Sequence, residues 1–164
     1  MPGRTYEFVQ LDVFTQRPLA GNPLAIFTDA RGLNDAEMQA LAREMNLSET
    51  TFILPRDPAT EAREGKKVRI FTVEQELPFA GHPTLGTALH LHSLDQASPQ
   101  VTLDLKAGKI PVHFTANSES AGRERVGGQV FGEMRQRDPE FGTPFSREEV
   151  ARVIGISGEE IPSE

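Results

Sequence analysis

Apolar residues fall on alternate positions, or form short runs, in several parts of the chain, and this pattern predicts β-strands. Near the start, Val9, Leu11 and Val13 share one face, while Phe8 and Phe14 share the other. Two alternating runs on either side of Ala107-Gly108 predict a β-hairpin. The predicted strands cover residues 6–15, 24–28, 68–73, 101–106, 110–115 and 126–134.

Helical spacing appears in two other segments, each with start and stop signals. In residues 34–45, Asn34 and Glu37 have the spacing of a capping box, and Asn46 is suited to a left-handed end. Four apolar residues form one stripe that favours core packing: Met38, Leu41, Ala42 and Met45. Ser146 and Glu149 predict a second capping box, for a short helix that ends at Gly155.

A third helix is expected in the stretch that follows residues 68–73. Pro83 suits the first helical position, with His82 as the cap, and residues 85–89 leave this helix almost no polar side. We therefore expect it to be buried. The polar segments 55–67 and 117–125 predict exposed loops. Together these elements predict an α+β fold, in which a mostly antiparallel sheet curls around one apolar helix.

The start of the predicted buried helix is a candidate binding site. Free N–H groups and the helix dipole favour an anion such as a carboxylate, and Gly81 leaves room for a ligand to approach. The alternative is a buried helix whose entry turn needs Gly and Pro for geometry alone. Glu49 lies between a helix end and a strand start, where catalytic groups are common, although most such glutamates are simply solvated.

Composition narrows the classes of function. The 164 residues suffice for one ordinary domain, and the absence of cysteine excludes disulfides, thiolate metal sites and cysteine nucleophiles. The net charge of −7, without a basic run, argues against nucleic acid as a partner. No apolar run suggests a signal core or a membrane span, so we expect a cytoplasmic protein. His90, His92 and His113 lack a ligand pattern, so no metal is expected.

Five motifs, in order along the chain, resemble the N-terminal half of the PhzF-like phenazine biosynthesis family. They are Asp12-Val-Phe-Thr, Gly21-Asn-Pro-Leu-Ala-Ile-Phe, Met45-Asn-Leu-Ser-Glu-Thr-Thr-Phe, Arg69-Ile-Phe-Thr and Glu76-Leu-Pro-Phe-Ala-Gly-His-Pro-Thr-Leu-Gly-Thr-Ala. The resemblance implies a diaminopimelate-epimerase-like fold, in which two similar halves each wrap a barrel around a central helix. The substrate lies between the halves.

The resemblance also implies a chemistry. The type member isomerises trans-2,3-dihydro-3-hydroxyanthranilate, a small carboxylate, without metal or organic cofactor. By resemblance, Glu49 is the acid/base that moves a proton between carbons, and Ser48, Gly81 and His82 line the same cleft. Relatives with racemase chemistry use cysteines from both halves, and the lack of cysteine here favours the glutamate version.

The resemblance covers only the family's first half. We expect residues 1–135 to form the N-terminal barrel domain, and residues 136–164 to form a crossing segment and short helix towards a second domain. A gene fragment, a split protein or a degenerate paralogue would each fit this pattern. The chain would then be an isomerase, or a catalytically inactive half that acts as a binding or dimerisation module. A homodimer or a complementing second-half chain could complete the cleft.

Overall fold

The computed structural model describes residues 3–116, 130–136 and 138–162, which form a mixed α+β fold. The helices are α1 (Asp35–Met45), α2 (Pro58–Glu64), α3 (Gly81–Leu94), α4 (Arg147–Ile154) and the 3₁₀ helix η2 (Gly158–Glu160). The strands are β1 (Phe8–Val13), β2 (Asn22–Phe27), β3 (Thr50–Ile53), β4 (Lys66–Phe71), β5 (Glu76–Leu77), β6 (Gln100–Leu105), β7 (Gly108–Ala116) and β8 (Val130–Met134).

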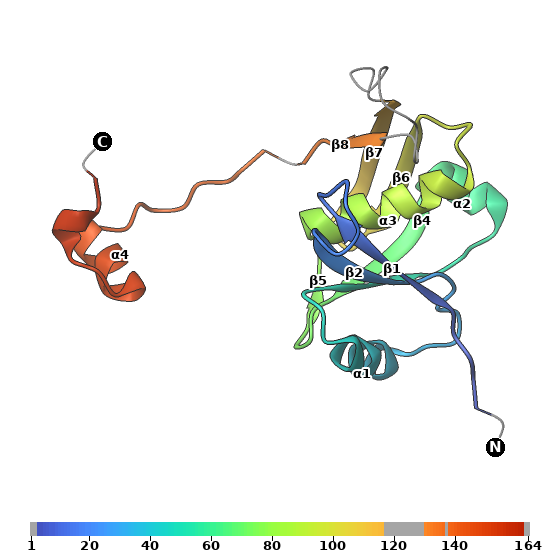
Figure 1. Cartoon of the computed structure of the whole chain (residues 1–164), viewed down its shortest axis with the longest axis horizontal. Coiled ribbons are helices and arrows are strands. Elements are labelled where there is room, and N and C mark those ends of the chain that lie inside the picture. The colour runs from blue at the N-terminus through green and yellow to red at the C-terminus, as the bar shows by residue number, and fades with distance from the viewer. Residues whose placement is uncertain (1–2, 117–129, 137, 163–164) are drawn as a thin grey trace.

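The strands form one sheet that curls strongly around α3, so that the helix lies inside a half-barrel (Figure 1). Its order is β1-β2-β3-β4-β6-β7-β8, and β5 pairs with β4. The pairs β2/β3 and β4/β6 are parallel, and the other five pairs are antiparallel. Helix α3 contacts strands from both ends of this order, β1 and β8. The predicted curled, mostly antiparallel sheet around an apolar helix is confirmed.

Each face of the sheet has its own core. The inner core lies between the sheet and α3, and the outer core lies between the sheet and α1, where the Phe27 and Phe52 rings stack 4.8 Å apart. Met38 and Ala42, from the predicted apolar stripe of α1, are buried in the outer core. Burial of large apolar side chains contributes about 1.5–3 kcal/mol each. The inner core holds the sheet against α3, and the outer core holds it against α1.

Capping signals in the sequence are confirmed at α1 and α4. Asn34 Oδ1 accepts from the Glu37 N–H at 3.0 Å, and the Glu37 carboxylate accepts from the Asn34 N–H at 2.9 Å. Asn46 ends α1 in the left-handed conformation. Ser146 and Glu149 form the same reciprocal pair at the start of α4, which ends at Gly155.

Two local predictions were wrong. Residues 55–67 were expected to form an exposed loop, but they contain α2, because Asp57 Oδ1 accepts from the Thr60 N–H and Pro58 starts the helix. His82 was expected to be the cap residue of α3, with Pro83 at the first helical position, but Pro83 is the third residue of the helix. Instead, Ala80 is the cap residue, no side chain caps the helix, and His82 lies inside its first turn.

The C-terminal part of the chain leaves the sheet. The predicted strand 126–134 is observed as Val130–Met134, while residues 126–129 and the predicted loop 117–125 lie outside the described residues. Beyond β8, an extended segment leads to α4, which lies apart from the half-barrel (Figure 1). Val153 on α4 is 82% exposed. Across the described ranges, no helix has the length and apolar character needed to cross a membrane.

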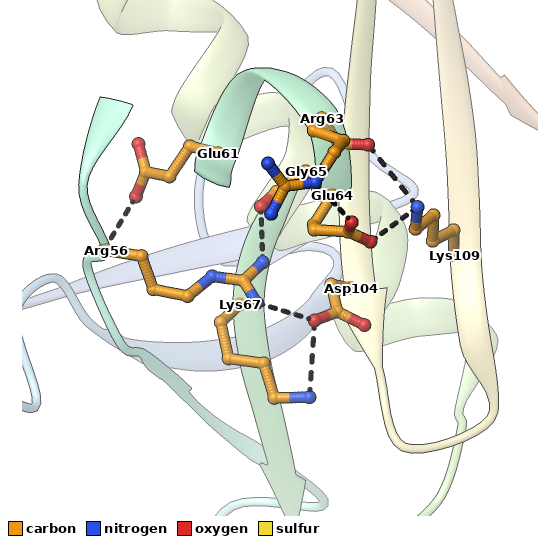
Figure 2. Close-up of polar contacts among 8 residues, drawn as sticks. All are labelled: Arg56, Glu61, Arg63, Glu64, Gly65, Lys67, Asp104 and Lys109. Atoms are coloured by element: carbon orange, nitrogen blue, oxygen red, sulfur yellow. Dashed lines mark hydrogen bonds and ion pairs between the residues drawn. The ribbon is translucent and has the colours of Figure 1, made fainter. Parts of the chain in front are cut away.

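A polar network links the loop around α2 to the hairpin β6–β7 (Figure 2). Arg56 Nη1 donates to Asp104 Oδ2 at 3.0 Å, and Arg56 Nη2 donates to the Gly65 carbonyl at 2.7 Å. Lys67 Nζ lies 3.5 Å from the same carboxylate oxygen of Asp104. Gly65 has φ +86°, and a Cβ there would lie 2.5 Å from the Thr102 carbonyl oxygen. These contacts fix the end of β3 against β6.

Candidate active site

Glu49 and His82 lie in direct contact at the start of two elements. Glu49 immediately precedes β3, and His82 is the second residue of α3. Glu49 Oε2 lies 2.9 Å from His82 Nδ1, which is hydrogen-bond distance. The Glu49 side chain is 19% exposed and that of His82 is 9% exposed. The fold therefore holds a carboxyl group and an imidazole together in a largely dry position that keeps some access for a ligand.

The other ring nitrogen of His82 decides where the protons lie. His82 Nε2 is 3.2 Å from the carbonyl oxygen of Asn22. A carbonyl oxygen can only accept, so Nε2 carries hydrogen and donates. A neutral ring of this tautomer would place the Nδ1 lone pair against Glu49, so one further proton must lie between Nδ1 and Oε2. Two arrangements fit this geometry. The shared proton lies either on Nδ1, which gives an imidazolium and a carboxylate, or on Oε2, which gives a neutral imidazole and a carboxylic acid.

The second carboxyl oxygen of Glu49 has no such partner. Glu49 Oε1 makes no hydrogen bond to the part of the chain that the structure describes. One oxygen is therefore held by His82, while the other is free to accept a proton from a bound molecule and to return it. A side chain held in this way by a neighbour has the positioning that acid/base catalysis requires.

The first turn of α3 adds hydrogen-bond donors beside this pair. Because no side chain caps the helix, the N–H groups of Gly81 and His82 lack partners in the described chain, and Pro83 has no N–H. Such groups and the helix dipole attract an anion. A Cβ on Gly81 would lie 3.2 Å from Met134 Cε, so the end of β8 passes close to this turn. The absence of a side chain keeps the turn accessible.

The other sequence candidates take different positions. Ser48 is exposed beside Glu49, and its side chain makes no hydrogen bond to the described residues. His92 stacks on Phe114 at 4.3 Å, and its Nδ1 contacts the Ser98 carbonyl, so it packs in the core. Burial lowers the pKa of His90, and His113 is exposed. In the described ranges, no group of at least three His, Cys, Asp or Glu side chains could hold a metal ion.

Sequence reasoning gave no role to two residues that contact the His82 ring, or to a third that closes the loop carrying them. Asn22 supplies the carbonyl oxygen that receives the Nε2 hydrogen, and the ring of Phe14 lies 6.2 Å from the His82 ring. Asp12 Oδ2 accepts from the Leu19 N–H at 2.7 Å and so closes the loop between β1 and β2. The motifs at Asp12 and Gly21 were visible, but a backbone carbonyl and a loop conformation leave no residue-specific signal of a contact.

Comparison with protein families gives a match over most of the chain. The model of the phenazine biosynthesis-like protein family, PhzC-PhzF, matches residues 11–156. A trans-2,3-dihydro-3-hydroxyanthranilate isomerase of Pseudomonas aeruginosa is 38% identical over 160 residues, which cover 97% of this chain and 52% of that protein. An uncharacterized isomerase of Mesorhizobium japonicum is 50% identical over 91 residues, 56% of this chain and 29% of that protein. The matched residues thus span little more than half the length of the first relative and less than a third of the second.

Solved structures give the same result. A predicted epimerase of Pseudomonas aeruginosa superposes with a TM-score of 0.77 at 38% identity, over 94% of this chain and 52% of that one. A PhzF-family phenazine biosynthesis protein of Bacillus anthracis superposes with a TM-score of 0.70 at 30% identity, over 94% and 48%. Sequence motifs, family model and fold agree, and this chain belongs to the phenazine biosynthesis-like protein family, PhzC-PhzF.

Proposed function

We propose that this chain forms one wall of an isomerase that moves a proton between carbon atoms of a small carboxylate, with Glu49 as the acid/base. The observation that carries the proposal is the 2.9 Å contact between Glu49 Oε2 and His82 Nδ1. Membership of a family whose relatives include a trans-2,3-dihydro-3-hydroxyanthranilate isomerase supports the same reaction class. The substrate of this chain is then an unsaturated ring carboxylate of that type.

In this proposal, the start of α3 binds the substrate and Glu49 transfers the proton. The substrate carboxylate would bind the N–H groups of Gly81 and His82, because they have no partner in the described chain. Glu49 Oε1 would take the proton from one carbon while the bond electrons move into the neighbouring double bond. The same oxygen would return the proton to another carbon, so no atom or electron is gained or lost and no cofactor is needed. Ser48, exposed beside Glu49, would line the cleft.

His82 would keep Glu49 ready for both steps. Its Nδ1 hydrogen stabilises the carboxylate before the first transfer, and the Asn22 carbonyl keeps the ring oriented through Nε2. The carboxyl group therefore does not have to turn between the two steps. A positioned acid/base of this kind contributes about 10²–10⁴ in rate.

The half-barrel around α3 is consistent with one half of a diaminopimelate-epimerase-like fold. In this proposal, residues 1–135 form the first wall of the cleft and residues 136–164 lead towards a second wall. The exposed apolar residues of α4 suit a contact with another folded body, such as Val153 at 82% exposure and Ile154 at 58%. We propose that a second copy of the chain supplies that wall.

Deuterium uptake tests the proposal directly. The chain is incubated with trans-2,3-dihydro-3-hydroxyanthranilate in deuterated water over a range of protein concentrations, and both the isomerised product and deuterium bound to carbon are measured by NMR. We expect uptake with the unchanged protein and a loss of about 10²–10⁴-fold with Glu49→Gln, which is nearly isosteric but cannot take the proton. Glu44→Gln is the matched control, because Glu44 is exposed on α1.

Either of two results would overturn the proposal. One is uptake by Glu49→Gln at the rate of the unchanged chain, which would remove Glu49 from the reaction. The other is the absence of both isomerised product and deuterium uptake at every concentration, which would show that this chain and its homo-oligomer do not catalyse the transfer.

A further inference from the structure

Phe14 is an aromatic residue in an unusual position beside the Glu49–His82 pair. It follows the last residue of β1, has φ +63° and is 70% exposed. A positive φ is rare for a bulky side chain and costs about 1–3 kcal/mol. Its ring centroid lies 6.2 Å from that of His82, with the two planes tilted by 48°. The chain thus bears strain to keep an apolar ring exposed next to the candidate site.

The strained conformation moves Phe14 to the side of the sheet that faces α3. Along β1, Val13 points to the inner core, so the alternation of a strand would direct Phe14 to the opposite face. The left-handed turn interrupts that alternation and brings the ring beside His82 on α3. Packing in either core does not explain the conformation, because Phe14 belongs to neither core cluster.

The loop that carries Phe14 is closed by specific contacts. Asp12 Oδ2 accepts from the Leu19 N–H at 2.7 Å, and Leu19 also has φ +63°. Gly21 is required at the end of the loop, because a Cβ there would clash with the Val13 carbonyl. The next residue, Asn22, holds His82 through its carbonyl oxygen. One loop therefore fixes both the Phe14 ring and the orientation of the imidazole.

We propose that Phe14 is a specificity-determining wall of the cleft, which favours a planar, unsaturated ring carboxylate over a saturated one. This inference rests on the proposed function and adds the basis of substrate choice to it. An exposed aromatic face attracts another π-system through offset or edge contacts, worth about 0.5–1.5 kcal/mol beyond area burial. A saturated ring of the same size lacks that interaction. A ligand carboxylate at the N-terminus of α3 would lie within reach of both the ring and Glu49.

Binding of two matched probes tests the inference without requiring turnover. The full chain is titrated by calorimetry with benzoate, which is aromatic, and with cyclohexanecarboxylate, which is saturated. Phe14→Leu keeps an apolar side chain but removes the π-face, and Phe14→Tyr restores it. Phe141→Leu is the matched control, because Phe141 is 91% exposed and lies in the segment between β8 and α4.

We expect Phe14→Leu to weaken binding of the aromatic probe by about 2–10-fold and to leave the saturated probe within about twofold. Phe14→Tyr and Phe141→Leu should bind both probes like the unchanged chain. Equal weakening of both probes, no weakening of either, or no binding of the aromatic probe by the unchanged chain would overturn the inference. Equal weakening together with altered sedimentation would assign Phe14 to a protein contact instead.

The two proposals fail separately. Selective weakening by Phe14→Leu, combined with normal deuterium uptake by Glu49→Gln, would retain the aromatic wall and reject Glu49 as the acid/base. Loss of uptake in Glu49→Gln without selective weakening by Phe14→Leu would retain Glu49 as the acid/base and reject the aromatic wall.

Discussion

The two ends of β3 carry part-buried charged groups that are arranged in opposite ways. Beyond its C-terminal end, both Nη atoms of Arg56 donate to Asp104 and Gly65, and only Nε lacks a partner in the described chain. Before its N-terminal end, Glu49 has one oxygen on His82, and the other has no hydrogen-bond partner among the described residues. The side chains are similarly covered, with 26% exposure for Arg56 and 19% for Glu49. The degree of burial therefore does not distinguish an ion pair that stabilises the fold from a pair that could take part in catalysis.

The difference lies in which polar atoms remain available. A charged group whose hydrogen bonds are all made to neighbouring strands can only stabilise those strands. Removing one partner leaves the other group buried without a hydrogen bond, which lowers stability. A carboxyl group with a free oxygen beside uncapped N–H groups can exchange a proton with a ligand. We expect substitutions near Arg56 to lower the stability of the fold, and substitutions at Glu49 to lower activity.

The largest effect on stability should come from Gly65→Ala. Gly65 has φ +86° and ψ −178°, a region that is almost confined to glycine, and its Cβ would lie 2.5 Å from the Thr102 carbonyl oxygen. We expect the free energy of unfolding to fall by about 2–4 kcal/mol in urea titrations. Gly142→Ala is the control, since nothing lies within 4 Å of its Cβ position. A loss for Gly65→Ala as small as that of the control would show that β4 and β6 can separate without cost.

Removal of the guanidinium should have the next largest effect. Arg56→Met keeps most of the apolar stem but leaves the Gly65 carbonyl without its donor, and Asp104 with Lys67 alone. We expect a loss of about 1–3 kcal/mol in the free energy of unfolding. Arg63→Met, at a side chain that is 67% exposed, should change it by less than about 0.5 kcal/mol. Deuterium uptake should persist in both variants, and its loss in Arg56→Met would contradict the division between the two ends.

The smallest effect concerns pH and the carboxyl group of Glu76, near the Glu49 end of the sheet. The Arg69 guanidinium, which donates to Glu76 at 2.8 and 2.9 Å, lowers the pKa of Glu76 from its usual 4.5. A lowered folded-state pKa contributes stability that is present above pH 4.5 and is lost as the pH falls through the lowered value.

Unfolding midpoints measured from neutral to acidic pH check this expectation. In Glu76→Gln, the decrease in the free energy of unfolding between neutral and acidic pH should be smaller than in the unchanged chain, by less than about 1 kcal/mol. In the exposed control Glu74→Gln, that decrease should be unchanged. An unchanged acid slope in Glu76→Gln would assign the acid sensitivity to other carboxyl groups.

Prediction from sequence succeeded where the signal is local. The capping residues of α1 and α4, the apolar face of α3 and the hairpin β6–β7 each depend on residues a few positions apart. It failed at α2, where charged residues concealed a helix that Asp57 caps and Pro58 starts. It also failed at the start of α3, because the His82 side chain contacts Glu49 and Asn22, which are distant in sequence, rather than the helix backbone.

By itself, the sequence determined the α+β class, the buried helix and the family resemblance, because periodicity, caps and motifs are properties of neighbouring residues. It also placed Glu49 and His82 at element ends. Only the tertiary structure decided that these two side chains meet, that the Asn22 carbonyl fixes the imidazole and that Phe14 adopts a strained conformation beside it. Those contacts join residues from four separate elements and loops, and their geometry exists only once the sheet has curled around α3.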